Sequence, residues 1–92
     1  MLGTRANARG CGGMALYHFD TWNNGRLMRE EIGVELDSFD RAKSEAARSL
    51  VDLARDILPD STDRMLAVEV REGAGPILRV ALRFRIVAVQ ER

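Results

Sequence analysis

Cysteine, proline, histidine and aromatic residues are all scarce in this chain of 92 residues. Cys11 is the only cysteine, so the chain cannot form an internal disulfide or a metal site built from several thiolates. His18 is the only histidine, and no serine or cysteine stands at a spacing that would make an acyl-transfer site with it. No apolar run reaches the roughly 18 residues of a membrane-spanning helix, and the N-terminus lacks the apolar core of a secretory signal. These absences predict a cytoplasmic, non-enzymatic protein without cofactor or metal.

An excess of charge of one sign is also absent, because 14 basic residues balance 14 acidic ones. The whole molecule therefore has no electrostatic preference for nucleic acid or membranes, and charge-driven binding needs a local patch. We predict a disordered N-terminal extension at residues 1–13, which hold four glycines and no acidic residue, and a single domain at residues 14–92. Cys11 would be exposed in this extension, and the alternative to an inert thiol there is a reactive or bridging one.

Residues 37–59 have the pattern of one amphipathic helix. Apolar residues recur at three- and four-residue steps, which places them on one stripe, and charged residues fall largely on the other side. The stripe consists of Phe39, Ala42, Ala46, Leu50, Leu53, Ala54, Ile57 and Leu58. Asp37 or Ser38 can cap the first turn, and Pro59 prevents continuation. Because a single helix cannot bury its own stripe, the flanking segments must supply a sheet.

The segment before the helix predicts two or three strands. Residues 15–22 are rich in β-favouring types, and Asn24-Gly25 suits a tight hairpin turn into a returning strand at residues 26–31. A short strand at residues 34–36 follows a turn at Gly33. The hairpin register predicts three pairs on one face of the sheet: Trp22 with Leu27, Asp20 with Arg29, and His18 with Glu31.

Two further strands are predicted after the helix, at residues 65–72 and 77–89, joined by a loop at residues 73–76. In both, apolar residues recur at every second position, which is the period of a strand. One face carries Leu66, Val68 and Val70 on the first strand and Leu78, Val80, Leu82, Phe84 and Ile86 on the second. The chain therefore predicts an α+β two-layer fold, in which one helix packs on one face of an antiparallel sheet of four to five strands. The predicted order is β-β-(β)-α-β-β.

Several short motifs resemble a family of small bacterial proteins catalogued as domain of unknown function 6894. They are Tyr17-His18-Phe19, the Asn24-Gly25 turn, the stretch from Glu30 to Leu36, and Ala42, Glu45 and Ala46 in the helix. The resemblance covers about residues 14 to 85 and implies a compact α+β domain without an assigned activity. The order of elements is also similar to that of HicB-like antitoxins, but Ile32-Gly33-Val34 stands where those proteins have a Pro-Gly-Cys turn.

Two candidate sites are weighed against structural roles. His18, Asp20 and Glu31 offer metal-ligand chemistry on one face of the first hairpin, but Arg29 among them favours ordinary cross-strand ion pairing. The loop Gly73-Ala74-Gly75-Pro76 is rich in glycine, as phosphate-binding loops are. It leads into a strand instead of a helix, so we interpret it as a hairpin connection.

Arginines form the remaining candidate site, as a nucleic-acid or partner contact on the sheet face away from the helix. They are Arg71, Arg79, Arg83 and Arg85. Such a stripe could follow a phosphate backbone, although Glu69 dilutes it and interleaved aromatics are lacking.

Protein association is the function that we favour from the sequence. A two-layer domain with one helix leaves a sheet face and a strand edge open, and Ala81, Val87 and Val89 add apolar surface to the last strand. We therefore predict an interaction or accessory module that acts as a homodimer through that strand or its outer face. The alternative is a nucleic-acid-binding or antitoxin-like regulator that uses the arginine-bearing face.

Overall fold

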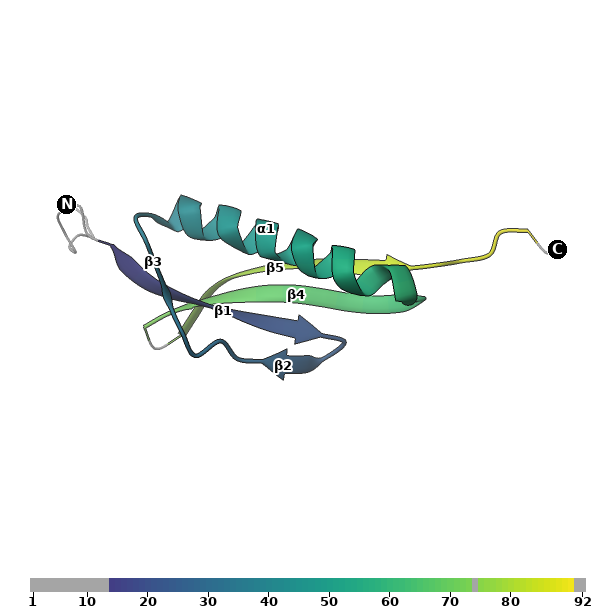
Figure 1. Cartoon of the computed structure of the whole chain (residues 1–92), viewed down its shortest axis with the longest axis horizontal. Helices are drawn as coiled ribbons and strands as arrows, with labels where there is room; N and C mark the ends of the chain where they lie inside the picture. Colours follow the sequence, from purple (N-terminus) through teal and green to yellow (C-terminus); the bar gives the residue numbers. More distant parts are fainter. Residues whose placement is uncertain (1–13, 74, 91–92) are drawn as a thin grey trace.

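The computed structural model describes residues 14–73 and 75–90 of the chain (Figure 1). The predictions for residues 1–13 and for Cys11 lie outside the described residues. The elements, in chain order, are β1 (Ala15–Asn23), β2 (Arg26–Met28), β3 (Val34–Leu36), α1 (Phe39–Ile57), the short 3-10 helix η1 (Leu58–Asp60), β4 (Asp63–Glu72) and β5 (Gly75–Arg85). One antiparallel sheet of five strands and one long helix confirm the predicted α+β two-layer fold. Across the described residues, no helix has the length and apolarity that a bilayer crossing requires.

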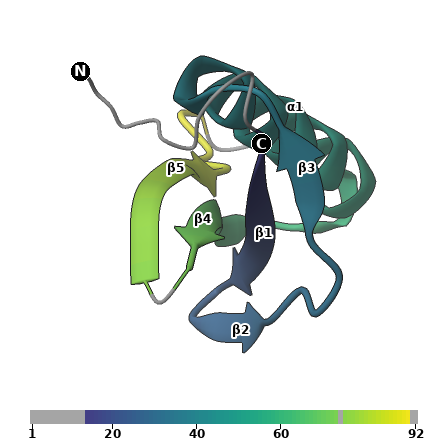
Figure 2. The same ribbon diagram turned by 90° about the vertical axis from the view of Figure 1, so that its left-hand side faces the viewer.

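The sheet has the order β2-β1-β4-β5, and β3 also pairs with β1 (Figure 2). Because β4 occupies one edge of β1 along Tyr17 to Asn23, β2 and β3 must share the other edge. β2 pairs with the end of β1, at Thr21 to Asn23, and β3 pairs with its beginning, at Ala15 to Tyr17. The central strands are therefore β1 and β4, and in the part of the chain that the structure describes β5 pairs only with β4.

Local sequence signals set the hairpin turn and the start of the helix. Asn24 and Gly25 both have left-handed backbone angles, with φ of 52° and 86°, as the predicted type I′ turn requires. Ser38, one of the two predicted caps, begins α1 by accepting a hydrogen bond on its Oγ from the Arg41 N–H at 3.1 Å. Both features depend on residues within three positions of one another, which explains why the sequence predicts them.

The core lies between α1 and the sheet. Leu66, Val68 and Val70 of β4 are fully buried under the helix, as predicted, with partly buried Leu78, Val80 and Leu82 of β5 beside them. Ala42 and Ala46 of the helix are also fully buried, because their small side chains let the helix backbone approach the sheet closely. The prediction for Phe39 is wrong. Its side chain stands at the first turn, ahead of the buried part of the stripe, and is 47% exposed.

Two predicted strands end earlier than the sequence indicates. β2 stops at Met28 instead of residue 31, so the predicted pairs Asp20–Arg29 and His18–Glu31 do not form in the ladder. β5 ends at Arg85, whose partner Asp63 is the first residue of β4, and only the Ile86 N–H continues the pairing, by donating to the Thr62 carbonyl at 2.8 Å. A strand cannot extend past its partner, so residues 86–90 leave the sheet.

The connection from β2 to β3 packs on the sheet face opposite the helix. A Cβ atom at Gly33 would lie 2.6 Å from Leu16 Cγ, closer than real Cβ atoms approach, and 3.1 Å from His18 Nε2, a tight contact. A larger residue at this position would therefore displace the Leu16 side chain, and glycine permits the close contact with β1. This contact covers part of the face that the sequence predicts to be open.

Candidate functional site

The face opposite the helix carries the predicted arginines, and those of β5 lie in one row. Arg79, Arg83 and Arg85 alternate with the apolar residues that face the helix, and they stand opposite β4 residues Glu69, Met65 and Asp63. Their side chains are about half exposed. The sequence thus places all three correctly on one side of the sheet.

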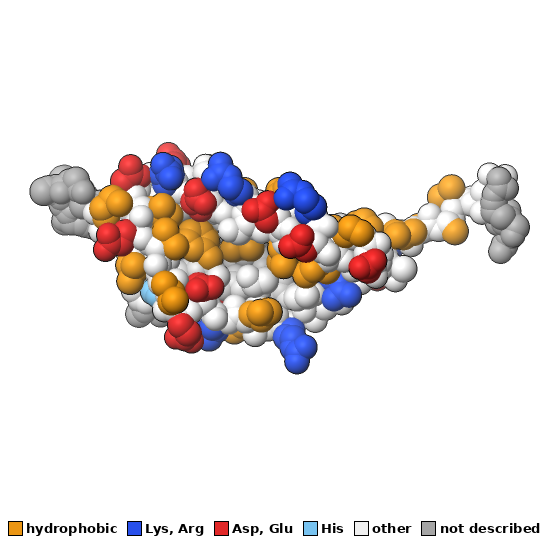
Figure 3. Space-filling model, in the orientation of Figure 1, with side chains coloured by type: hydrophobic (Ala, Val, Ile, Leu, Met, Phe, Trp, Pro, Cys, Tyr) orange, Lys and Arg blue, Asp and Glu red, His pale blue; other side chains and the backbone are white. Residues whose placement is uncertain are grey.

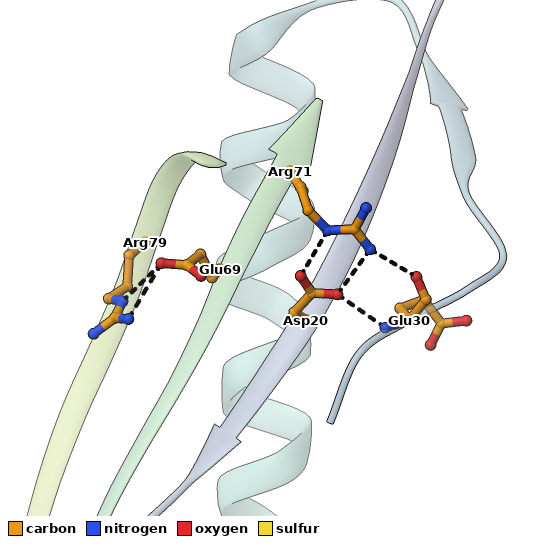
Figure 4. A network of polar contacts seen from close by, with 5 residues as sticks. All are labelled: Asp20, Glu30, Glu69, Arg71 and Arg79. Carbon is orange, nitrogen blue, oxygen red and sulfur yellow. Dashed lines mark hydrogen bonds and ion pairs between the residues drawn. The ribbon is translucent and has the colours of Figure 1, made fainter. Parts of the chain in front are cut away.

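Carboxylates of β4 engage each of these three arginines. Arg79 donates from Nε and Nη2 to Glu69 Oε2 at 3.3 and 3.2 Å (Figure 4). Arg83 donates from Nε to Asp63 Oδ1 at 3.0 Å, and Arg85 Nη2 reaches Asp63 Oδ2 at 3.5 Å. The hydrogen bond from Arg83, with the charges of both arginines, lowers the pKa of Asp63 below its usual value. The three positive charges are therefore offset by two negative ones, and the row is much weaker as an anion-binding surface than its sequence indicates.

Trp22 adds an aromatic ring to this face. The Arg79 guanidinium carbon lies 5.4 Å from the centre of the Trp22 ring, within the range of a cation–π contact. Trp22 of β1 pairs with Ala67 of β4, whereas Arg79 of β5 pairs with Glu69, so the Arg79 side chain reaches across β4 to the Trp22 ring. Ala67 is buried although it points away from the helix. The prediction that the arginine face lacks interleaved aromatics is therefore wrong at this position.

Arg71 has a different environment from the other arginines. It donates from Nε to Asp20 Oδ2 at 2.9 Å and from Nη2 to Asp20 Oδ1 at 3.3 Å, which makes a two-pronged ion pair. It also donates to the Glu30 carbonyl at 3.1 Å, while the Glu30 N–H donates to Asp20 Oδ1 at 2.9 Å (Figure 4). Three segments far apart in the sequence meet here. We call this set the Asp20–Glu30–Arg71 network.

The network is largely shielded from solvent. Asp20 is 3% exposed, and the Arg71 side chain is 17% exposed. The hydrogen bonds from Arg71 outweigh burial and lower the pKa of Asp20. Because the network engages the backbone N–H and carbonyl of Glu30, these two groups bond to side chains instead of to the backbone of β1, and β2 ends at Met28. Arg71 thus holds the β2–β3 connection on the sheet. Little of the Arg71 side chain is accessible to a partner.

The residues weighed as metal ligands do not assemble into a site. Asp20 bonds to Arg71 and Glu30, and within residues 14–73 and 75–90 no three His, Cys, Asp or Glu side chains gather closely enough to hold a metal ion. The positively charged guanidinium of Arg71 occupies the position beside the Asp20 carboxylate that a metal ion would need. The arrangement is that of a structural ion pair.

An apolar groove between helix and sheet was not predicted from the sequence. Its volume is about 490 Å³, and it is open along one side. The lining residues are Val51, Ala54, Arg55, Leu58, Pro59 and Phe84. The signal that could have indicated it is Val51, an apolar residue just outside the predicted buried stripe of the helix.

Residues 86–90 form an extended segment beyond β5, which we call the C-terminal arm. It runs outward from the body of the domain (Figure 1). Hydrophobic side chains along it stand apart from the rest of the surface (Figure 3). Ile86 is 59% exposed, Val87 63% and Val89 94%. The sequence predicts residues 77–89 as one strand and shows that Val87 and Val89 are apolar. It does not indicate that the residues after Arg85 lie outside the sheet.

Comparison with known proteins gives one match. A family model described as Domain of unknown function (DUF6894) matches residues 16–83, which is most of the chain and includes every buried residue of the hydrophobic core. No curated protein and no solved structure matches. The resemblance stated from the sequence motifs is confirmed, whereas the likeness to HicB-like antitoxins stays a prediction. On the strength of this match, the chain belongs to the family described as Domain of unknown function (DUF6894).

Proposed function

We propose that this domain is a non-enzymatic interaction module that acts as a homodimer through the open edge of β5. The observation that carries the proposal is that, among residues 14–73 and 75–90, β5, a strand of 11 residues, pairs with β4 alone. The backbone groups on its other edge can pair with another strand. A second copy of β5 in antiparallel orientation satisfies those groups on both molecules by one two-fold contact.

The side chains of β5 also favour pairing over exposure. Natural edge strands are protected by short length, by bulges, by proline or by charged side chains, and β5 has Pro76 near its start and three arginines on the face away from the helix. β5 is long, and its helix-side row of Leu78, Val80, Leu82 and Phe84 is apolar and only partly buried. Its single register shift lies near the hairpin, between Val70 and Arg71 of β4, so the rest of the edge is regular. A second copy would extend the sheet and cover the exposed part of this row.

The oligomeric state tests the proposal. Size-exclusion chromatography with light scattering, at tens of micromolar protein, should give about twice the chain mass of 10.3 kDa. Dilution should shift the peak toward the monomer, because a contact of this size has a measurable dissociation constant. A mass of one chain at that concentration would overturn the proposal.

Nucleic-acid binding, or an antitoxin-like regulatory role, is the second candidate function. The observation that favours it is Arg79 stacked against Trp22, because an aromatic ring and a guanidinium together can hold a base and a phosphate. Against it, Arg83 and Arg85 would have to leave Asp63 to contact phosphates. We therefore place this function second.

Gel retardation separates this candidate from the first. Nucleic-acid binding through these arginines should weaken steeply between low and physiological salt, because the affinity comes from released counterions. It should disappear in the triple variant Arg79→Ala, Arg83→Ala, Arg85→Ala. The matched control is Arg41→Ala, Arg48→Ala, Arg55→Ala, which removes three arginines from the exposed side of α1. Absence of retardation at low salt removes the candidate.

A further inference from the structure

We infer that the C-terminal arm of each copy docks into the apolar groove of the other copy. This inference rests on the proposed homodimer and adds where its specificity lies. The arm and the groove each expose apolar side chains to solvent within a single copy. The arm exposes Ile86, Val87 and Val89, and the groove exposes Val51 and the side of Phe84 that no residue of the described chain covers.

The arm does not fill the groove of its own chain. It leaves the domain at the end of β5 and runs away from α1 (Figure 1). The Ile86 N–H donates to the Thr62 carbonyl, and no later residue among those described makes a backbone hydrogen bond to the domain. Beyond this bond its side chains are mostly exposed, up to 94% at Val89. A segment of four apolar residues, without glycine, proline or charge, is poorly suited to remain in water.

The strand geometry places the arm of a second copy over the groove. If two β5 strands pair antiparallel near their C-terminal ends, each arm continues as a strand along the edge of the other β5. Five residues at about 3.3 Å each reach roughly 16 Å, enough to lie beside half of β5. The groove is at that half, because Phe84 lines it.

The alternation of side chains then selects which arm residues enter the groove. Phe84 points to the helix side of the sheet, so Ile86 and Ala88 continue that row once the arm is extended as a strand. A two-fold axis perpendicular to the sheet keeps this side the same in both copies. Ile86 and Ala88 of one copy therefore meet Val51 and Phe84 of the other, while Val87 and Val89 lie on the opposite face.

The apolar lining of the groove matches the aliphatic side chains of the arm. Val51, Ala54, Leu58, Pro59 and Phe84 offer an apolar wall, and Arg55, the charged residue at the groove, is already paired with Asp52 at 2.9 Å. An aliphatic side chain fits such a wall, and a charged one does not. The arm of a second copy supplies the aliphatic side chains and delivers them twice per dimer.

Two neighbouring substitutions test the inference. Ile86→Asp and Val87→Asp change residues of nearly equal exposure, 59% and 63%, that point to opposite faces of the arm. In dilution series followed by light scattering, Ile86→Asp should weaken the dimer at least about tenfold and Val87→Asp by no more than about threefold. Equal effects of the two variants in a dimer that persists would overturn arm docking and leave the proposed homodimer intact. A wild-type monomer would overturn both.

A cross-linking measurement keeps the test independent of how Ile86→Asp folds. Two chains are prepared in a Cys11→Ala background, one with Val51→Cys and one with Ala88→Cys and a mass tag, then mixed and oxidised. Each chain has one thiol, so a bond between the two types can form only between copies. We expect a mixed disulfide, whereas an untagged chain with Val34→Cys in place of Val51→Cys should form none with the tagged Ala88→Cys chain. Absence of the mixed product in a dimeric sample would overturn the inference.

Discussion

The Arg71→Met variant should lose about 3 kcal/mol of unfolding free energy, which is the cost of leaving a buried carboxylate without its cation. Asp20, which is 3% exposed, would retain only the hydrogen bond from the Glu30 N–H. Methionine keeps much of the length of the arginine side chain, so the loss measures charge and hydrogen bonding more than volume. Urea denaturation of both proteins, followed by circular dichroism, gives the difference directly.

Two controls define what this loss means. Arg83→Met removes an exposed ion pair and should leave the urea midpoint nearly unchanged. Asp20→Asn combined with Arg71→Met should recover part of the loss, because no charge is then buried. A loss in the Arg83 variant as large as that in the Arg71 variant would contradict a special role for the Asp20–Glu30–Arg71 network.

Lowering the pH should reduce the difference in unfolding free energy between the wild type and the Arg71→Met variant. The pKa of Asp20 is below its ordinary value of 3.8 in the folded protein, so the unfolded chain binds more protons as pH falls. The contribution of the ion pair is thus complete above that ordinary value and is lost as pH falls through the lower, folded pKa. Removing Arg71 removes the cause of the lowering. A difference that stays constant from pH 7 to the acid limit of folding would show that the network is not electrostatic.

The Leu66→Ala variant should lose about 3 kcal/mol of unfolding free energy. Leu66 is fully buried on β4, between Asn23 of β1 and Leu82 of β5. Truncation removes buried apolar atoms and leaves a cavity that the sheet and helix cannot close without distortion. The measurement is again a urea curve, and the slope should stay that of the wild type if the variant keeps the native fold.

Leu27→Ala is the matched control for this substitution. Leu27 is also a strand leucine, but it lies on the three-residue edge strand β2 and is 39% exposed. Its truncation should cost less than about 1 kcal/mol, because much of the side chain already contacts water. Similar losses at Leu27 and Leu66 would mean that the core is not where the structure places it.

The parts of the fold that the sequence predicts well depend on local rules. Ser38 caps α1 through a bond to Arg41, and Asn24-Gly25 makes its turn without help from distant residues. Alternation along β4 and β5 also identifies the helix-facing residues, because the period of a strand does not change with its neighbours. Element types and faces could therefore be derived before any contact was known.

The errors are at positions that distant residues control. β2 ends early because Arg71 and Asp20, separated by 51 positions, hold Glu30 between them. β5 ends early because β4 begins at Asp63, a limit that the alternating pattern of β5 does not contain. The groove likewise combines Val51 of α1 with Phe84 of β5. The predicted row of arginines was correct in position, but its pairing with Glu69 and Asp63 required the register between strands.

The central position of β4 bears on how the chain acquires its structure during translation. α1 and the β1–β2 hairpin leave the ribosome first, yet both find their packing surface on β4, which is made after them. An isolated helix or hairpin of this size has little stability in water. Nascent chains that end before residue 63 therefore leave the apolar stripe of the helix exposed, and the domain forms only after β4 has been made.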